Sequence, residues 1–250
     1  MPDNFWDQRK VDWYDRALAE SDYSGKILSV IIPLVKSCRS VIDVGAGCGP
    51  IAVPLARLGY DVTALEPSPS MMNKIKEKAD KEKLSNLRMI EKKFEESSPG
   101  HHDAAIVANV RKLFMDIPML LRGIEKISPQ TVILITGADT SNNKFYFNEL
   151  YPLIFGESYP ERETHEVVFD ELFRFGIKAE VTFINYNLDQ PFVSLDEAVV
   201  FWKAYMKLED SKFDKTLREF LSGKLVYDGK WLRAEVKKKS AIIWWNRESR

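Results

Sequence analysis

The sequence has no long apolar run, few cysteines and almost no net charge, and each shortage excludes a class of protein. No window approaches the roughly eighteen consecutive apolar residues that a membrane-spanning helix needs, so no membrane association is expected. The two cysteines, Cys38 and Cys48, and the three histidines form no metal-ligand spacing, so no metal site is expected. The formal net charge of −1 provides no basic field for binding nucleic acid.

The composition indicates an ordered globular protein. Hydrophobic residues make up 45% of the chain and charged residues 29%. The 250 residues suffice for one large α/β domain, and we expect a single domain over residues 1–250. Residues 1–15 lack the apolar core of a signal peptide, and the low cysteine content fits a reducing compartment, so the expected location is the cytoplasm. The sequence carries no signal for an oligomeric state.

Short apolar segments bounded by polar or turn residues alternate with segments of helical period. The expected strands are Val41–Val44, Asp61–Leu65, Leu87–Ile90, Ala104–Ala108 and Thr131–Thr136. Between the last two, apolar residues from Ile117 to Ile127 fall on one helical face, with Asp116 placed as the N-cap. This alternation predicts βαβ units and a parallel sheet.

The last third of the chain changes character. Residues 194–197 have the form of a capping box and begin a helix, and a second helix is expected over residues 211–221. Residues 240–245 read as a final strand. The lysine-rich run at residues 74–83 is interpreted as the solvated face of a helix.

The most informative segment is VIDVGAGCGP, residues 41–50. A β-branched strand containing Asp43 leads into glycines at alternate positions, which allow a sharp turn or close approach of a ligand to the backbone. Dinucleotide-binding loops need Gly-x-Gly-x-x-Gly/Ala, and Pro50 stands at the last position, which disfavours a nicotinamide enzyme. A tight turn without any ligand is the alternative.

Glu66 supplies a second signal. It ends the next expected strand, 21 positions after Gly45, where α/β nucleotide-binding folds place an acid on ribose hydroxyls. Ser68 and Pro69 then read as an N-cap and a first helical residue. The alternative is a solvated strand-end carboxylate. In the ribose role, loss of Glu66 should weaken ligand binding and leave the stability of the free protein almost unchanged.

These two segments, the glycine loop with Asp43 and the string EPSPSMM at residues 66–72, resemble the first two motifs of class I S-adenosylmethionine-dependent methyltransferases. The resemblance covers roughly residues 35–140 and is looser from residue 177 to 245. It implies a doubly wound, Rossmann-like α/β fold with helices on both faces of a seven-stranded sheet. The strand order would be 3-2-1-4-5-7-6, mostly parallel, with an antiparallel last strand.

The resemblance also implies S-adenosylmethionine as cofactor and S-adenosylhomocysteine as product. The cofactor-binding residues that it implies are Asp43, Gly45, Ala46, Gly47, Gly49, Glu66, Pro67, Met71, Phe94 and Asn109. One position departs from the family: Lys93 stands where an acid often binds the adenine amino group, and lysine can only donate. Glu95, a backbone carbonyl or contact with Phe94 would then serve the adenine.

The sequence says less about which residues bind the methyl acceptor. In-line methyl transfer depends mainly on positioning the two reactants, so no universal catalytic residue is expected. Residues 139–176 form a long aromatic segment that we expect to cover the acceptor site. It contributes Tyr146 and Tyr151 as substrate-binding candidates, beside Arg111, and His165 as a candidate general base. The alternatives are that the rings are core residues and that the histidine is structural.

The aromatic amino-terminal segment, residues 1–38, is expected to form a helical lid over the cofactor or a helix held to the surface by its rings. The sequence as a whole predicts a methyltransferase acting on a small organic acceptor by in-line displacement. Two alternatives stay open: a non-catalytic module that binds the cofactor or its product, and a nucleic-acid or protein methyltransferase. The chain lacks the Asn/Asp-Pro-Pro-Tyr/Phe motif of enzymes that methylate amino groups of nucleic acids.

Overall fold

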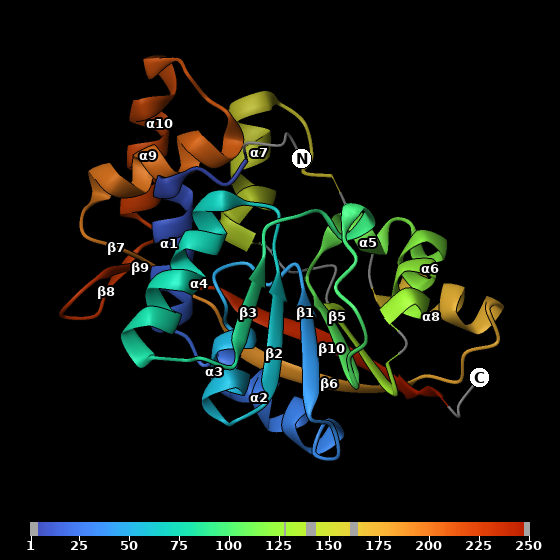
Figure 1. Ribbon diagram of the computed structural model, residues 1–250. Coiled ribbons are helices and arrows are strands. Elements are labelled where there is room, and N and C mark those ends of the chain that lie inside the picture. Colours follow the sequence, from blue (N-terminus) through green and yellow to red (C-terminus); the bar gives the residue numbers. More distant parts are fainter. Residues whose placement is uncertain (1–4, 128, 139–143, 161–164, 248–250) are drawn as a thin grey trace.

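The computed structural model describes residues 5–127, 129–138, 144–160 and 165–247. In these residues seven strands form one sheet of order β3-β2-β1-β4-β5-β10-β6 (Figure 1). The strands are β1 (Ser40–Val44), β2 (Asp61–Leu65), β3 (Leu87–Ile90), β4 (Ala104–Ala108), β5 (Thr131–Gly137), β6 (Glu180–Asn187) and β10 (Lys237–Asn246). The first five are parallel, and β10 pairs antiparallel with both β5 and β6. The expected order, with the last strand inserted antiparallel before the sixth, is confirmed.

Helices cover both faces of the sheet, which explains why the central strands are nearly continuous apolar runs. One face packs against α1 (Gln8–Ala19), α2 (Tyr23–Leu34), α3 (Ala52–Arg57) and α4 (Pro69–Glu82). The other packs against η1 (Phe94–Glu96), α5 (Arg111–Phe114), α6 (Ile117–Ile127) and α8 (His165–Arg174). Alternation decides the face: Val41 belongs to the first core and Ile42 to the second.

Two helix starts have the caps that the sequence predicts. The Ser68 hydroxyl accepts a hydrogen bond from the Met71 N–H at 3.4 Å, and Pro69 is the first residue of α4. The Asp116 carboxylate accepts from the Met119 N–H at 2.9 Å at the start of α6. Side-chain caps of this kind satisfy amides that have no partner inside the helix.

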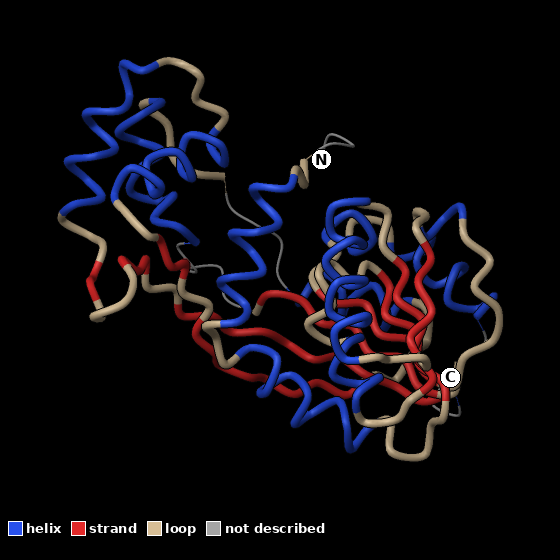
Figure 2. The backbone as a smooth tube through the Cα atoms, turned by 60° about the vertical axis from the view of Figure 1, so that its left-hand side comes forward, coloured by secondary structure: helices blue, strands red, loops and turns tan. Residues whose placement is uncertain are grey.

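The remaining elements form a helical lobe beside the sheet. It contains η2 (Lys144–Tyr146), α7 (Phe147–Phe155), α9 (Leu195–Met206), η3 (Ser211–Phe213) and α10 (Asp214–Ser222), with a small sheet of β7 (Gln190–Phe192), β9 (Leu232–Ala234) and β8 (Val226–Tyr227). Its core is aromatic: Phe192, Phe201 and Trp202 are fully buried. Figure 2 shows the lobe on one side of the molecule, with α1 between it and the sheet. None of the described helices is long and apolar enough to cross a membrane.

Part of the lysine-rich helix α4 contacts α1, so the expectation of a solvated face is wrong for two of its lysines. Lys78 lies 2.5 Å from the Asp15 carboxylate and donates to the Cys48 carbonyl at 2.8 Å. Lys74 lies 3.4 Å from Asp12. The lysine stems reach across a helix interface, and their charges pair there with α1.

Candidate functional site

The glycine loop connects β1 to α3 and turns through left-handed backbone at residues 45, 47 and 49. Gly45, with φ of 73°, packs so closely on Val110 that an added Cβ would lie 2.4 Å from its Cγ2 atom. Gly47, with φ of 56°, faces more open space, since its nearest neighbour would be Tyr14 Cε1 at 4.0 Å. The first glycine therefore serves packing, whereas the second leaves its backbone approachable.

Asp43 lies on β1 just before this loop and is 1% exposed. Its Oδ2 atom accepts a hydrogen bond from the Ala52 N–H at 3.1 Å. Its Oδ1 atom is buried and has no hydrogen-bond partner among the described residues. Burial raises the pKa of Asp43 to about 7, and the nearby Glu66 carboxylate adds to the rise. The unsatisfied oxygen marks a position suited to a donor or cation.

Glu66 follows β2 and supports the glycine loop directly. One carboxylate oxygen accepts from the Gly47 N–H and the other from the Ser68 N–H, both at 2.9 Å. The residue is 7% exposed, so the alternative of a solvated strand-end carboxylate is wrong. Burial raises its pKa. Each oxygen keeps a second lone pair, so the carboxylate retains capacity to accept from hydroxyl groups.

The other residues expected at the cofactor differ in exposure. Ala46 is buried within the loop and Met71 lies in the core under α4, whereas Pro67 is exposed. Phe94 packs against Gly123 of α6, where an added Cβ would lie 2.3 Å from its ring. Phe94 therefore contributes to the core that includes α6.

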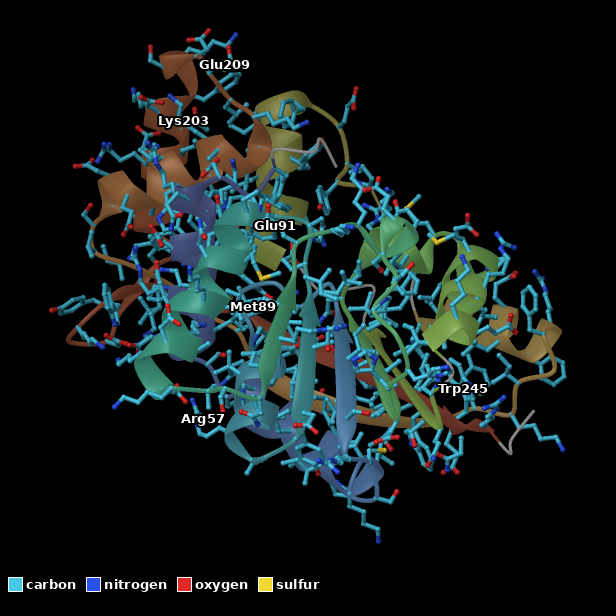
Figure 3. The ribbon with its side chains drawn as sticks, viewed as in Figure 1. Arg57, Met89, Glu91, Lys203, Glu209 and Trp245 are labelled. Atoms are coloured by element: carbon cyan, nitrogen blue, oxygen red, sulfur yellow. The ribbon has the colours of Figure 1, made fainter. Side chains whose placement is uncertain are left out.

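The segment after β3 contains two acids near Lys93. Glu95 pairs with Lys112 at 2.8 Å, so its charge is already compensated. Glu91, which the sequence reasoning did not consider, is exposed and lies at the edge of the sheet where β1, β2 and β3 end (Figure 3). Its position directly after a strand is the signal that would have identified it.

Asn109 follows β4 and faces the glycine loop side of the sheet edge. Its backbone is left-handed, with φ of 57°, and its Nδ2 atom donates to the Tyr23 hydroxyl at 3.1 Å. The next residue, Val110, is the one that contacts Gly45. The structure thus brings Asn109 to the loop, as expected, and adds Tyr23, which no sequence motif indicated.

Helix α1 lies between the glycine loop and the helical lobe. Tyr14 lies beside Gly47, while Trp13 donates to Glu197 of α9 at 2.9 Å. Arg16 pairs with the same carboxylate at 2.7 Å. These contacts hold α1 to α9, with Tyr14 of α1 beside the loop.

The acceptor-side candidates lie in separate places. Tyr146 stacks on Trp202, with ring centroids 6.1 Å apart, and Tyr151 contacts Phe155, both in the lobe. Arg111 begins α5, two residues after Asn109, and is exposed.

His165 begins α8, and its ring lies 5.1 Å from that of Phe183 on β6, the strand at the far edge of the sheet from β3. Its Nδ1 atom is buried without a partner among the described residues. The structure does not bring His165 to the glycine loop. The aromatic segment of residues 139–176 is divided: α7 joins the lobe and α8 packs on α6, and residues 139–143 and 161–164 lie outside the described part.

Comparison with known proteins bears on this arrangement. Residues 41–128 match a family model described as a methyltransferase domain. The chain is 24% identical over 253 residues to an uncharacterized protein of Haemophilus influenzae, covering 98% of this chain and 90% of that protein.

Solved structures share the fold. The YcgJ protein of Bacillus subtilis is 16% identical with a TM-score of 0.54, over 87% of this chain and 96% of that one. Magnesium protoporphyrin IX methyltransferase of Synechocystis, with bound S-adenosylhomocysteine, is 14% identical with a TM-score of 0.54. The match covers 88% of this chain and 82% of that one. A putative methyltransferase of Bacillus halodurans is 12% identical with a TM-score of 0.51. The match covers 82% of this chain and 90% of that one. The strand order and the glycine loop agree with the match of residues 41–128 to a methyltransferase-domain model.

Proposed function

We propose that this protein binds S-adenosylmethionine at the glycine loop and transfers its methyl group to a small organic acceptor. The observation that carries the proposal is the buried Oδ1 atom of Asp43, which has no partner among the described residues. A buried carboxylate oxygen without a donor is costly, so its presence beside a glycine loop indicates a site built for a ligand with positive or N–H groups.

The residues around the loop fit this cofactor. Gly47 leaves its backbone approachable, Glu66 retains lone pairs for ribose hydroxyls, and Asp43 offers an unsatisfied oxygen. Glu91 is an exposed acid at the same sheet edge and would be the residue that accepts from the adenine amino group. The carboxyl ends of parallel strands beside a change in strand order are where open α/β sheets bind ligands, and β1 and β4 meet at such a point.

When bound, the cofactor supplies a methyl group already activated by its positive sulfur. The chain's own contribution is to hold the reactants in line and to keep water away. Tyr23 is 3% exposed, and burial raises its pKa, so its hydroxyl stays protonated and can orient neighbouring groups. His165 contacts Phe183 of β6, at the opposite end of the sheet from β3, so the proposal gives it no role as a general base.

A small acceptor is favoured over a nucleic acid by the net charge of −1 and by the sequence after β4. That sequence is Ala108-Asn109-Val110-Arg111, without the paired prolines of enzymes that methylate amino groups of nucleic acids. Magnesium protoporphyrin IX methyltransferase, which shares the fold, is named for a small-molecule acceptor. Arg111, which is exposed and follows Asn109 by two residues, would be a charged contact for the acceptor.

The test is direct. Isothermal titration of the purified protein should show micromolar binding of S-adenosylmethionine and S-adenosylhomocysteine and no binding of NAD. Transfer of labelled methyl groups to a panel of small alcohols, amines, thiols and carboxylic acids should then identify the acceptor class. Binding of NAD alone would overturn the cofactor assignment, and cofactor binding without any transfer would favour a non-catalytic module.

A further inference from the structure

Tyr23 and Asn109 form a hydrogen-bonded pair that joins helix α2 to the end of β4. The Asn109 Nδ2 atom donates to the Tyr23 hydroxyl at 3.1 Å across 86 positions of sequence. Tyr23 is buried, whereas Asn109 remains exposed at the sheet edge. Because β1 and β4 are parallel neighbours, Asn109 and the glycine loop follow their strands at the same edge of the sheet.

The backbone at Asn109 supports a functional role for this position. Its φ of 57° lies in the left-handed region, which few residues other than glycine adopt and which asparagine tolerates best. Non-glycine residues in this region gather at binding sites. Val110, the next residue, packs on Gly45, so the position of Asn109 is fixed relative to the loop.

The hydrogen bond to Tyr23 also determines which end of the amide is free. With Nδ2 donating to the hydroxyl, Oδ1 is the end that has no hydrogen bond to any described residue. An amide oxygen carries partial negative charge. The Tyr23 hydroxyl oxygen uses one lone pair to accept from Asn109 and keeps its other lone pair close to that amide. Burial of Tyr23 keeps its hydroxyl neutral, since it raises the pKa of the group.

We propose that the Tyr23–Asn109 pair distinguishes the methylated cofactor from its demethylated product. This rests on the proposed function. S-adenosylmethionine carries a positive sulfur and a polarised methyl group, and S-adenosylhomocysteine carries neither. An oriented amide oxygen attracts a cation and accepts weak C–H hydrogen bonds, so it favours the substrate form. Favouring the charged cofactor over the product aids product exchange after each transfer.

Tyr186 provides a matched control. Its ring lies 4.9 Å from that of Tyr23, and it is also buried, but its hydroxyl bonds to Ser240 at 3.0 Å instead of Asn109. Replacing Tyr186 by phenylalanine therefore removes a buried hydroxyl in the same cluster without touching the amide. The two tyrosines differ in the feature that the proposal requires.

The experiment measures the dissociation constants of S-adenosylmethionine and S-adenosylhomocysteine by isothermal titration for each variant. In Tyr23→Phe the preference for the methylated form should fall by about threefold to tenfold, the scale of one hydrogen bond. Tyr186→Phe should keep the wild-type ratio. An unchanged ratio in Tyr23→Phe, or an equal loss of affinity for both ligands, would overturn the proposal.

Two substitutions at Asn109 should change the preference for S-adenosylmethionine in opposite directions. They test the proposal even if Tyr23→Phe does not fold. Asn109→Gly tolerates the left-handed backbone and removes the amide, so the preference for S-adenosylmethionine should fall. Asn109→Asp places a negative charge at the same point, so the preference should rise. Changes of the same sign in both variants would contradict the proposal. If the wild-type protein binds neither ligand, the proposed function itself fails, which is a different result from an unchanged ratio.

Discussion

The Glu66 carboxylate accepts a hydrogen bond from the Gly47 N–H at 2.9 Å, so the acid after β2 holds the loop after β1 in shape. A second bond, from the Ser68 N–H at 2.9 Å, fixes the start of α4 to the same side chain. Glu66 therefore has a structural role besides the ribose contact that its position predicts. The two roles have different consequences when the side chain is removed.

We expect Glu66→Ala to weaken S-adenosylhomocysteine binding by roughly 1.5–3 kcal/mol, the scale of hydrogen bonds to a charged group. The variant should also lose about 1–3 kcal/mol of unfolding free energy, because two amides lose their acceptor. Urea denaturation and isothermal titration measure the two effects separately. Glu82→Ala, which removes an exposed acid paired with Arg57, is the control and should leave both the affinity and the unfolding free energy almost unchanged. Full stability in Glu66→Ala would mean that the loop does not depend on this carboxylate.

The raised pKa of Asp43 makes stability depend on pH. Its folded pKa is about 7 against an ordinary value of 3.8, so folding favours the protonated form. The associated stability is fully present below about pH 4 and is lost as pH rises through 7. Each pH unit in this window is worth about 1.4 kcal/mol, so the loss amounts to roughly 4 kcal/mol by pH 8.

Asp43→Asn should abolish this dependence, because the amide does not titrate. Unfolding free energies of the two proteins, measured by urea denaturation from pH 5 to pH 8, should diverge as pH rises, with the wild type losing more. Glu66, whose pKa burial also raises, interacts with Asp43, so the wild type contains two coupled titrating carboxyl groups here and Asp43→Asn contains one. Parallel curves would show that Asp43 is ionised throughout this range.

The same carboxyl group should release a proton when the cofactor binds. At pH 6 an Asp43 with a pKa of about 7 is mostly protonated, and approach of a cationic group lowers that pKa. Isothermal titration in buffers of different ionisation enthalpy should therefore report proton release in the wild type. In Asp43→Asn the heat should become independent of the buffer. Buffer-independent heats in the wild type would place the cationic group elsewhere.

Local signals in the sequence were enough to predict most of the sheet. Strands β2, β3 and β4 have the predicted bounds, and Ser68 and Asp116 cap the predicted helices. These features depend on hydrophobic runs and turn residues that act over a few positions. The order of the strands came from the family resemblance, which local patterns alone do not supply.

Long-range contacts were not predictable in this way. The Tyr23–Asn109 bond and the Lys78–Asp15 pair join residues far apart in the sequence, and nothing in either local pattern indicates the partner. Residues 139–176 read as one aromatic cover, yet α7 and α8 pack on different parts of the molecule. Aromatic composition indicates burial, but it does not say against which surface.

Glu197 should prove important for both stability and cofactor binding, because it connects α9 to α1. Its carboxylate accepts from the Trp13 ring N–H at 2.9 Å, pairs with Arg16 at 2.7 Å and accepts from the Val193 N–H at 2.7 Å. Glu197→Ala leaves these donors without their acceptor and should cost about 2–4 kcal/mol of unfolding free energy.

Asp196, the preceding residue, is the matched control for Glu197. Both lie in the first turn of α9, but the Asp196 side chain is 76% exposed in its pair with Arg218, whereas that of Glu197 is 18% exposed. Asp196→Ala should therefore cost about 0.5 kcal/mol or less. Because Tyr14 on α1 lies beside Gly47, Glu197→Ala should also weaken S-adenosylhomocysteine binding, and Asp196→Ala should not. Urea denaturation and titration of both variants give the comparison. Equal effects in the two variants would mean that α1 stays over the loop without the Glu197 contacts.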